Sequence, residues 1–173
     1  MKPKKPPRIS FALLCTLHRK LVKTAKKKGD IGHFRKRQNW IGPENEGIEK
    51  AHYLPPKASQ IPRHMKNLSH YLHSKEKDPL VQTAIWMAQF LSIHPFMNGN
   101  GRVARAMIPI ILCYKKLLPA PHFNVEPYFK KYRQAYFEKL FAITQNQEWE
   151  EWIRFFLKGI IYTGKRVQRR TRK

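Results

Sequence analysis

The chain has 173 residues, enough for one domain with a sizeable hydrophobic core, and its 42% hydrophobic content excludes a wholly disordered protein. Its 35 Lys and Arg against 11 Asp and Glu give a formal net charge of +24, which favours anionic partners without distinguishing nucleic acid, acidic proteins and nucleotides. Residues 1–8 and 164–173 carry much of this excess. We therefore predict one domain at residues 9–163 between two basic tails, which are either simply solvated or bind nucleic acid.

The two cysteines and the apolar start of the chain indicate where the protein folds. Cys15 and Cys113 each lie in an apolar run without metal-ligand neighbours, so we expect reduced thiols and neither a disulfide scaffold nor a zinc site. Residues 9–17 resemble a signal peptide, but the apolar stretch is short and no small-residue cleavage site follows. No stretch approaches the roughly 20 apolar residues of a spanning helix. We expect a cytoplasmic protein without a membrane partner.

The first third of the chain predicts one helix and one hairpin. Apolar residues recur at helical spacing through residues 9–28, and Gly29 ends the pattern. The following stretch is rich in Gly and Pro, with short apolar segments on either side of the acidic turn GPENEG. This arrangement favours a small β-hairpin, and it is the one strand pairing that we expect.

The remaining two thirds read as amphipathic or buried helices. One begins at the dipeptide Ile61-Pro62 and ends at His73, since Pro is favoured in a first helical turn. The others are predicted at residues 78–93, 102–118, 121–144 and 147–162, with a kink or local break at Pro109. The predicted fold class is all-α, a bundle of about six helices with one hairpin arm. His64, His70 and His73 lack acidic neighbours, so we interpret them as surface residues and not as a metal site.

The stretch HPFMNGNGRVAR, residues 94–105, lies between two of these helices and suits phosphate chemistry. Glycines at 99 and 101 let successive N–H groups point into one concavity, and the N-terminus of the next helix adds partial positive charge. Arg102 and Arg105 are three residues apart, hence on one helical face, where they can clamp a polyphosphate. His94 can take a proton from an incoming hydroxyl. No Lys-Ser or Lys-Thr follows, which excludes a P-loop.

This stretch resembles the Fic signature HPFx(D/E)GNGRxxR, and it matches at every fixed position except residue 98. The resemblance extends to residues 31–42 and 51–56, which look like the part of Fic proteins that ends in a hairpin called the flap, and to residues 148–160, which look like their late helix. The chain is therefore identified as a member of the Fic/Doc superfamily, whose domains have an all-helical core and one small hairpin.

The resemblance implies transfer of AMP from ATP to a Ser, Thr or Tyr hydroxyl of a target protein. His94 would be the general base, and Phe96 would anchor the loop in the core. Gly99, Asn100 and Gly101 would hold the α- and β-phosphates, with Arg102 and Arg105 on the outer phosphates. The flap would hold the target by adding a strand, through Trp40, Ile41, His52 and Tyr53. Related domains transfer other phosphate-containing groups with the same loop, so AMP is one of several possibilities.

Asn98 stands where the signature has the acid that binds Mg²⁺ or Mn²⁺. An amide oxygen can still donate to the metal but lacks the charge, so we expect slower catalysis or dependence on high metal. The alternative is a catalytically degenerate Fic scaffold that binds nucleotide or an acidic or nucleic-acid partner.

Many Fic proteins also carry an inhibitory (S/T)xxxE(G/N) helix, which we do not find in this sequence. Thr144 and Glu148 have the spacing, but Trp149 follows them, and we interpret that segment as structural. A separate inhibitor protein, an unregulated enzyme and a shortened, inactive copy all remain compatible with the sequence.

Overall fold

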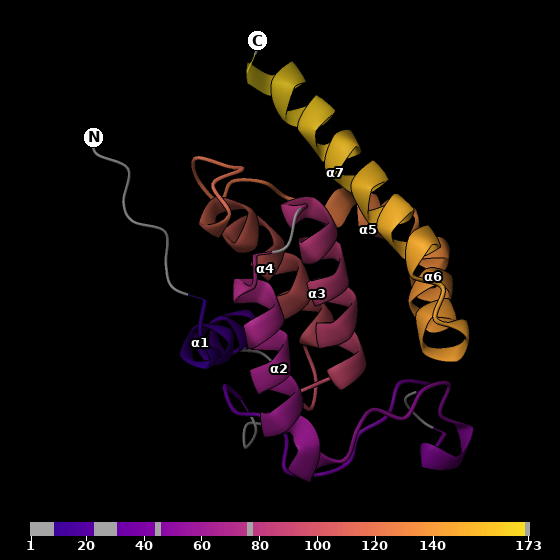
Figure 1. The fold of residues 1–173 in the computed structure, drawn as a ribbon. Helices are drawn as coiled ribbons and strands as arrows, with labels where there is room; N and C mark the ends of the chain where they lie inside the picture. Colours follow the sequence, from indigo (N-terminus) through magenta and orange to yellow (C-terminus); the bar gives the residue numbers. More distant parts are fainter. Residues whose placement is uncertain (1–8, 23–30, 44–45, 76–77, 172–173) are drawn as a thin grey trace. The chain divides into compact units, whose positions relative to one another are not determined.

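The computed structural model describes residues 9–22, 31–43, 46–75 and 78–171, and these form an all-α fold (Figure 1). The α-helices of the described residues are α1 (Phe11–Leu21), α2 (Ile61–His73), α3 (Pro79–Ile93), α4 (Asn100–Tyr114), α5 (Glu126–Lys131), α6 (Arg133–Asn146) and α7 (Trp149–Thr171). Two short 3-10 helices, η2 (Ile48–Lys50) and η3 (Ala58–Gln60), precede α2. The predicted all-α class is confirmed. No helix among these is both long and apolar enough to cross a membrane.

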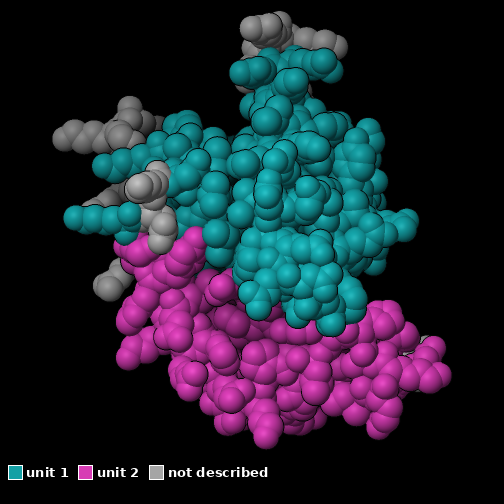
Figure 2. All heavy atoms as spheres, turned by 45° about the vertical axis from the view of Figure 1, so that its right-hand side comes forward, with its two compact units in different colours: residues 1–8, 75–88, 105–173 teal, residues 9–74, 89–104 magenta. Residues whose placement is uncertain are grey.

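The chain divides into two compact units, coloured separately in Figure 2. One unit, which we call the loop unit, comprises residues 9–74 and 89–104, and so holds α1, α2, the end of α3 and the start of α4. The other, the aromatic unit, includes the described residues of 75–88 and 105–173. Since α3 and α4 contribute residues to both, the HPFMNGNGRVAR stretch falls in the loop unit up to Ala104.

The core of the loop unit is built from two short amphipathic helices. Ser10 caps α1 by accepting a hydrogen bond from the Leu13 N–H, and the four-residue spacing of Leu14, His18 and Val22 places these three side chains on its buried face. Pro62 lies in the first turn of α2, where its missing N–H costs nothing. The buried face of α2 consists of Ile61, Met65, Leu68 and Leu72.

The core of the aromatic unit is a set of packed rings from α5, α6 and α7, which lie side by side in Figure 1. Trp152 is fully buried and donates its indole N–H to the Ala84 carbonyl at 2.8 Å, so its one polar atom is satisfied. Ring contacts join Tyr128, Phe129, Tyr136, Trp152, Phe155 and Phe156. Three other aromatic residues of the same segment, Tyr132, Phe137 and Phe141, are 40%, 48% and 45% exposed.

Two element predictions differ from the structure. The hairpin is not shown: in the described residues its place is taken by one isolated antiparallel bridge between Ile41 and Tyr53. The bridge does not extend because Pro43 lacks an N–H and η2 takes up the chain before Tyr53. The helix predicted at residues 121–144 is two helices, since Tyr132, at φ −109° and ψ 43°, leaves the α-helical region between α5 and α6.

The sequence predicted a kink or a local break at Pro109. The helix α4 continues through Pro109 without a break. The first helix ends at Leu21, and residues 23–28 of the predicted helix lie outside the described residues. At the other end, α7 runs to Thr171, so the basic stretch that begins at Lys165 continues this helix.

Candidate active site

The residues from His94 to Gly99 form a tight loop between α3 and α4 that requires unusual backbone angles at both ends. His94 has φ +49° and Gly99 has φ +72°. A side chain at position 99 would bring its Cβ to 2.5 Å from Val22 Cγ2, so only glycine fits there. A non-glycine residue in the left-handed region costs about 1 kcal/mol or more, and such strain concentrates at functional sites. The structure therefore singles out His94.

The imidazole of His94 is held in one tautomer. Its Nδ1 lies 3.1 Å from the Leu91 carbonyl oxygen, and because a carbonyl only accepts, Nδ1 must carry the proton. Burial lowers the pKa of His94 to about 4, the bond to Leu91 opposes this, and the charge of Arg35 adds to the lowering. At neutral pH the ring is therefore uncharged, and the lone pair of Nε2 is the proton acceptor.

Phe96 and Asn100 fix the middle of the loop. Phe96 is fully buried, with Phe34 and Phe90 around its ring. The Asn100 side chain bonds both main-chain groups of Phe96: Oδ1 accepts from its N–H at 2.9 Å, and Nδ2 donates to its carbonyl at 2.8 Å. Both ends of the Asn100 amide are thus used internally. A phosphate contact from Asn100 would come from its main-chain N–H, in the first turn of α4, where helix geometry leaves N–H groups without partners.

His18, which sequence reasoning missed, ties this loop to α1. Its ring stacks on Phe96 with centroids 4.0 Å apart and an interplanar angle of 4°. The Gly32 N–H donates to His18 Nδ1 at 2.8 Å, so Nε2 carries the proton and donates to the Asn98 carbonyl at 3.1 Å. Burial lowers the pKa of His18, which suits a neutral ring with both nitrogens engaged. Its four-residue spacing from Leu14 was the signal that could have identified it.

Arg35 and Asn39, also missed, hold the loop from the segment before the flap. Arg35 is 2% exposed; its N–H donates to the Pro95 carbonyl at 2.8 Å, and its Nε donates to the His94 carbonyl at 2.9 Å. Its Nη2 donates to the Pro56 carbonyl, and Asn39 Nδ2 donates to the Phe96 carbonyl at 3.0 Å. The carbonyls of three consecutive loop residues are therefore fixed by this one segment.

The two arginines of the motif have different surroundings. Arg102 is exposed, and its Nη1 donates to the Leu21 carbonyl at the end of α1 at 2.8 Å, using one of five guanidinium donors. Arg105, three residues further along α4, belongs to the aromatic unit. There its Nη2 lies 3.4 Å from Glu126 Oε1, and its charge opposes the burial that raises the pKa of Tyr136 to about 12.

Asn98 is the exposed residue of the loop, and its main-chain carbonyl accepts from His18. A metal ion at this position would find one protein oxygen of the predicted set, Asn98 Oδ1. Within the described residues no group of three His, Cys, Asp or Glu side chains comes together to hold a metal ion. These donors fit a cation that arrives bound to a nucleotide and keeps most of its ligands, and they do not form a dedicated metal cage.

The predicted flap residues come together around the single bridge. The Ile41 N–H donates to the Tyr53 carbonyl at 3.0 Å, and the N–H groups of His52 and Tyr53 both donate to the Ile41 carbonyl, at 2.9 and 3.1 Å. Trp40 is 37% exposed beside them. The Tyr53 hydroxyl donates to the Ser92 carbonyl at 3.1 Å, which joins the flap segment to the end of α3, two residues before His94.

The fold and the loop together define an all-helical domain with a neutral histidine and a glycine turn at a helix N-terminus, a geometry suited to anions. The model of the Fic/DOC family matches residues 8–112, so the chain belongs to this family. A probable protein adenylyltransferase of Aquifex aeolicus is 31% identical over 86 residues, which are 49% of this chain and 27% of that protein. The protein adenylyltransferase Fic of Drosophila mojavensis is 27% identical over 84 residues, 47% of this chain and 15% of that one.

Solved structures show the same fold. A Fic family protein from Desulfovibrio desulfuricans matches with a TM-score of 0.79 at 22% identity, over 95% of this chain and 48% of that one. Fic-1 from C. elegans matches with a TM-score of 0.67 at 19% identity, over 94% of this chain and 44% of that one. The chain thus spans about a quarter or less of the curated relatives named above and about half of these structures.

Proposed function

We propose that the chain is a Fic-type protein adenylyltransferase, which moves AMP from ATP to a Ser, Thr or Tyr hydroxyl of a target protein. The observation that carries the proposal is the state of His94. Its proton sits on Nδ1 against the Leu91 carbonyl, and its lowered pKa keeps Nε2 free of a proton at neutral pH. A partly buried, oriented imidazole of this kind can act as a general base toward a hydroxyl.

Residues of the loop supply the groups that the transfer reaction needs. His94 Nε2 takes the proton of the target hydroxyl while its oxygen forms a bond to the α-phosphorus of ATP. The bond from that phosphorus to the oxygen bridging to the β-phosphate breaks, and pyrophosphate leaves. The first N–H groups of α4, at Asn100 and Gly101, face the phosphates together with Gly99, and Arg102 and Arg105 take the outer charges. ATP binding raises the pKa of His94, because negative charge favours the imidazolium that this step forms.

Substrate and metal are assigned to neighbouring residues. Trp40, Ile41, His52 and Tyr53, which gather at the Ile41–Tyr53 bridge, are assigned to the target segment. Asn98 Oδ1 gives one oxygen to the Mg²⁺ or Mn²⁺ that accompanies ATP. When bound, the metal neutralises phosphate charge. Membership of the Fic/DOC family, which includes proteins named protein adenylyltransferases, does not depend on these residue roles.

Incubation of the purified chain and of a cell lysate with ATP and Mg²⁺ tests the proposal. We expect mass spectrometry to find one AMP group added to a hydroxyl side chain, of this chain or of a lysate protein. The control is the same incubation with a non-hydrolysable analogue whose bond after the α-phosphate cannot break. A different added group would replace AMP in the proposal, and no addition at any metal concentration would reject it.

A second candidate, a weakly catalytic scaffold that binds nucleotide, is favoured by the neutral side chain at the exposed position 98. The variant Asn98→Asp separates the two. We expect it to raise the transfer rate on the order of tenfold at limiting Mg²⁺, because a carboxylate attracts the cation more strongly than an amide oxygen does. Initial rates across a Mg²⁺ titration measure this, with Asn98→Ala as control. Activity in Asn98→Asp alone supports the scaffold, whereas equal metal dependence in the variant and the wild type removes position 98 as a metal contact.

A further inference from the structure

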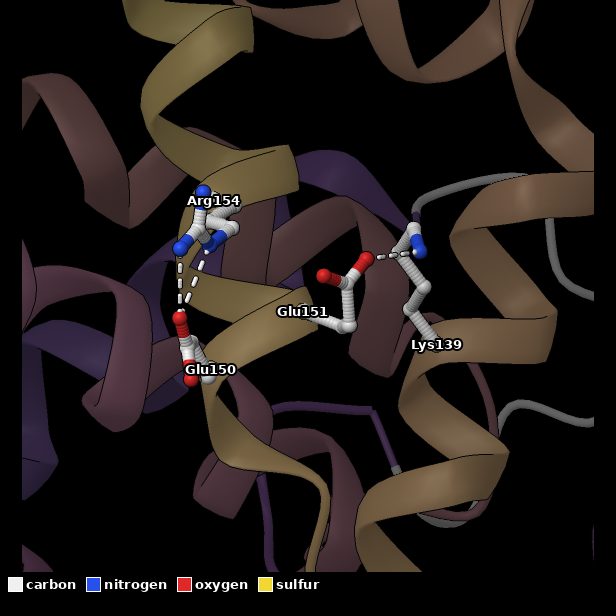
Figure 3. A network of polar contacts seen from close by, with 4 residues as sticks. All are labelled: Lys139, Glu150, Glu151 and Arg154. Atoms are coloured by element: carbon white, nitrogen blue, oxygen red, sulfur yellow. Dashed lines mark hydrogen bonds and ion pairs between the residues drawn. The ribbon is translucent and has the colours of Figure 1, made fainter.

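The two ends of α7 differ in charge and in whether nearby cations pair with carboxylates. Near its start, shown in Figure 3, every cation drawn has a carboxylate partner: Lys139 Nζ lies 2.9 Å from Glu151, and Arg154 Nη2 lies 2.6 Å from Glu150. From Trp152 to Thr171 the sequence contains no Asp or Glu. Among the side chains of this stretch that the structure describes, the exposed cations are Arg154, Lys158, Lys165, Arg166 and Arg169.

Towards its other end, α7 meets α5 in what we call the tyrosine–cation cluster, made of Lys131, Tyr132, Tyr162 and Arg166. Lys131 Nζ lies 5.2 Å from the ring centroid of Tyr132 and 5.8 Å from that of Tyr162. Arg166 Cζ lies 5.7 Å from the centroid of Tyr162, and its Nη1 donates to the Tyr162 hydroxyl at 3.3 Å. Two cations therefore share one tyrosine ring. Among the ion pairs of the described residues, none involves either of them.

The cluster also presents an exposed aromatic ring that packs against a buried one. Tyr132 is 40% exposed, at the point where the chain leaves α5 for α6. The buried ring of Tyr128 lies under both neighbours, with centroids 4.8 Å from Tyr132 and 5.5 Å from Tyr162. This support orients a ring that is accessible to a ligand. Lys131 beside the exposed ring of Tyr132, and Arg166 on the neighbouring ring of Tyr162, form a surface for a ligand that has both negative charge and flat aromatic groups.

We infer that the tyrosine–cation cluster binds single-stranded nucleic acid, with Lys131 and Arg166 on phosphates and Tyr132 stacked on a base. Free phosphate would need no ring, and a duplex keeps its bases stacked inside and unavailable to Tyr132. Lys158, Lys165 and Arg169 continue the positive surface along α7 over about 16 Å, at 1.5 Å per residue. The inference does not rest on the proposed adenylyl transfer, because no residue of the cluster is assigned to that reaction.

Binding of a short fluorescent oligothymidylate to the full chain, followed by anisotropy across a salt series, tests the inference. Arg166→Gln should weaken binding and reduce the slope of log affinity against log salt by about 0.7, the value for one phosphate contact on a single strand. The matched control is Arg154→Gln, which removes the same charge from the same helix but from a carboxylate-paired site. It should leave the slope unchanged. Equal effects of the two variants would reject the cluster as the binding site and would show that binding depends only on the net positive charge.

The ring has its own test at one salt concentration. Tyr132→Leu should weaken binding about tenfold by removing the stacking face, while Tyr132→Phe keeps it. Thermal unfolding of each variant verifies that the fold is intact, and His94→Ala should bind as the wild type does. Unchanged binding by Tyr132→Leu, tighter binding to duplex DNA of equal length, or preferential binding to vesicles containing an anionic phospholipid would each reject single-stranded nucleic acid as the ligand.

Discussion

Replacing His94 with Ala should reduce AMP transfer by about 10²- to 10⁴-fold, the usual contribution of a general base. ATP binding should persist, because the phosphates are assigned to the first turn of α4 and to the motif arginines. Transfer rates measured with saturating ATP, beside calorimetric titration with ATP, separate the two quantities. His70→Ala, which removes an exposed histidine of α2, serves as the control and should keep full activity. Transfer that persists in His94→Ala would eliminate His94 as the base.

The pH dependence of the wild type gives the same assignment a second check. The base is the neutral form of His94, and burial lowers the pKa of this group to about 4 in the free protein. The His94 limb of kcat/KM, which reports the free protein, should therefore be flat from neutral pH down to about pH 5 and fall as pH passes through about 4. Since bound ATP raises this pKa, the fall in kcat should occur at a higher pH. A fall in kcat/KM centred near pH 6.5, the ordinary histidine value, would contradict the lowered pKa of His94.

The sequence could predict most helices because each one has its own periodicity and start signal. The Ile61-Pro62 start and the spacing of Met65, Leu68 and Leu72 suffice to place α2. The division at Tyr132 could not be predicted. The helical spacing of the aromatic residues continues across Tyr132, although the backbone there is not α-helical. The predicted hairpin is not shown, for a related reason: apolar segments around a turn indicate that two segments pair but not over what length. In the described residues, Pro43 and η2 limit the pairing to one bridge.

For the candidate site, the motif identified the residues that would meet a phosphate but not those that hold the loop. Asn100 matched the motif, yet its side-chain amide hydrogen-bonds the main chain of Phe96, and no sequence pattern predicts that bond. Arg35 stands in a basic run that looks like a solvated surface, and it is 2% exposed only because its donors reach main-chain carbonyls from other segments. Long-range contacts of this kind leave no local pattern. The site residues themselves remain predictions.

A large effect on stability is expected at His18, whose ring nitrogens both form hydrogen bonds within the loop unit. Replacing it with Phe keeps the stack on Phe96 but leaves the Gly32 N–H and the Asn98 carbonyl without this partner. We expect a loss of about 3 kcal/mol in the free energy of unfolding, from two groups at roughly 1–3 kcal/mol each. Urea unfolding measures it, with the exposed His33→Ala as the control, and His18→Gln, which retains one amide donor, should be intermediate.

The same variant tests how His18 couples the loop to pH. Burial lowers the pKa of His18 below 6.5, so on acidification the unfolded chain binds a proton at this residue more readily than the folded chain does. The contribution of His18 to wild-type stability is therefore complete above pH 6.5 and is lost as pH drops through the folded-state pKa. A protonated Nδ1 could not accept from Gly32, and the Asn98–Gly99 turn would lose its link to α1. The variant should therefore show a shallower loss of stability between pH 6.5 and acid, and His94 and Glu151, whose pKa values are also lowered, contribute to the slope that remains. It should also have a higher KM for ATP, since the turn that presents the phosphate-binding N–H groups is no longer fixed. Wild-type stability, acid slope and KM in His18→Phe would show that the stack on Phe96 alone positions the loop.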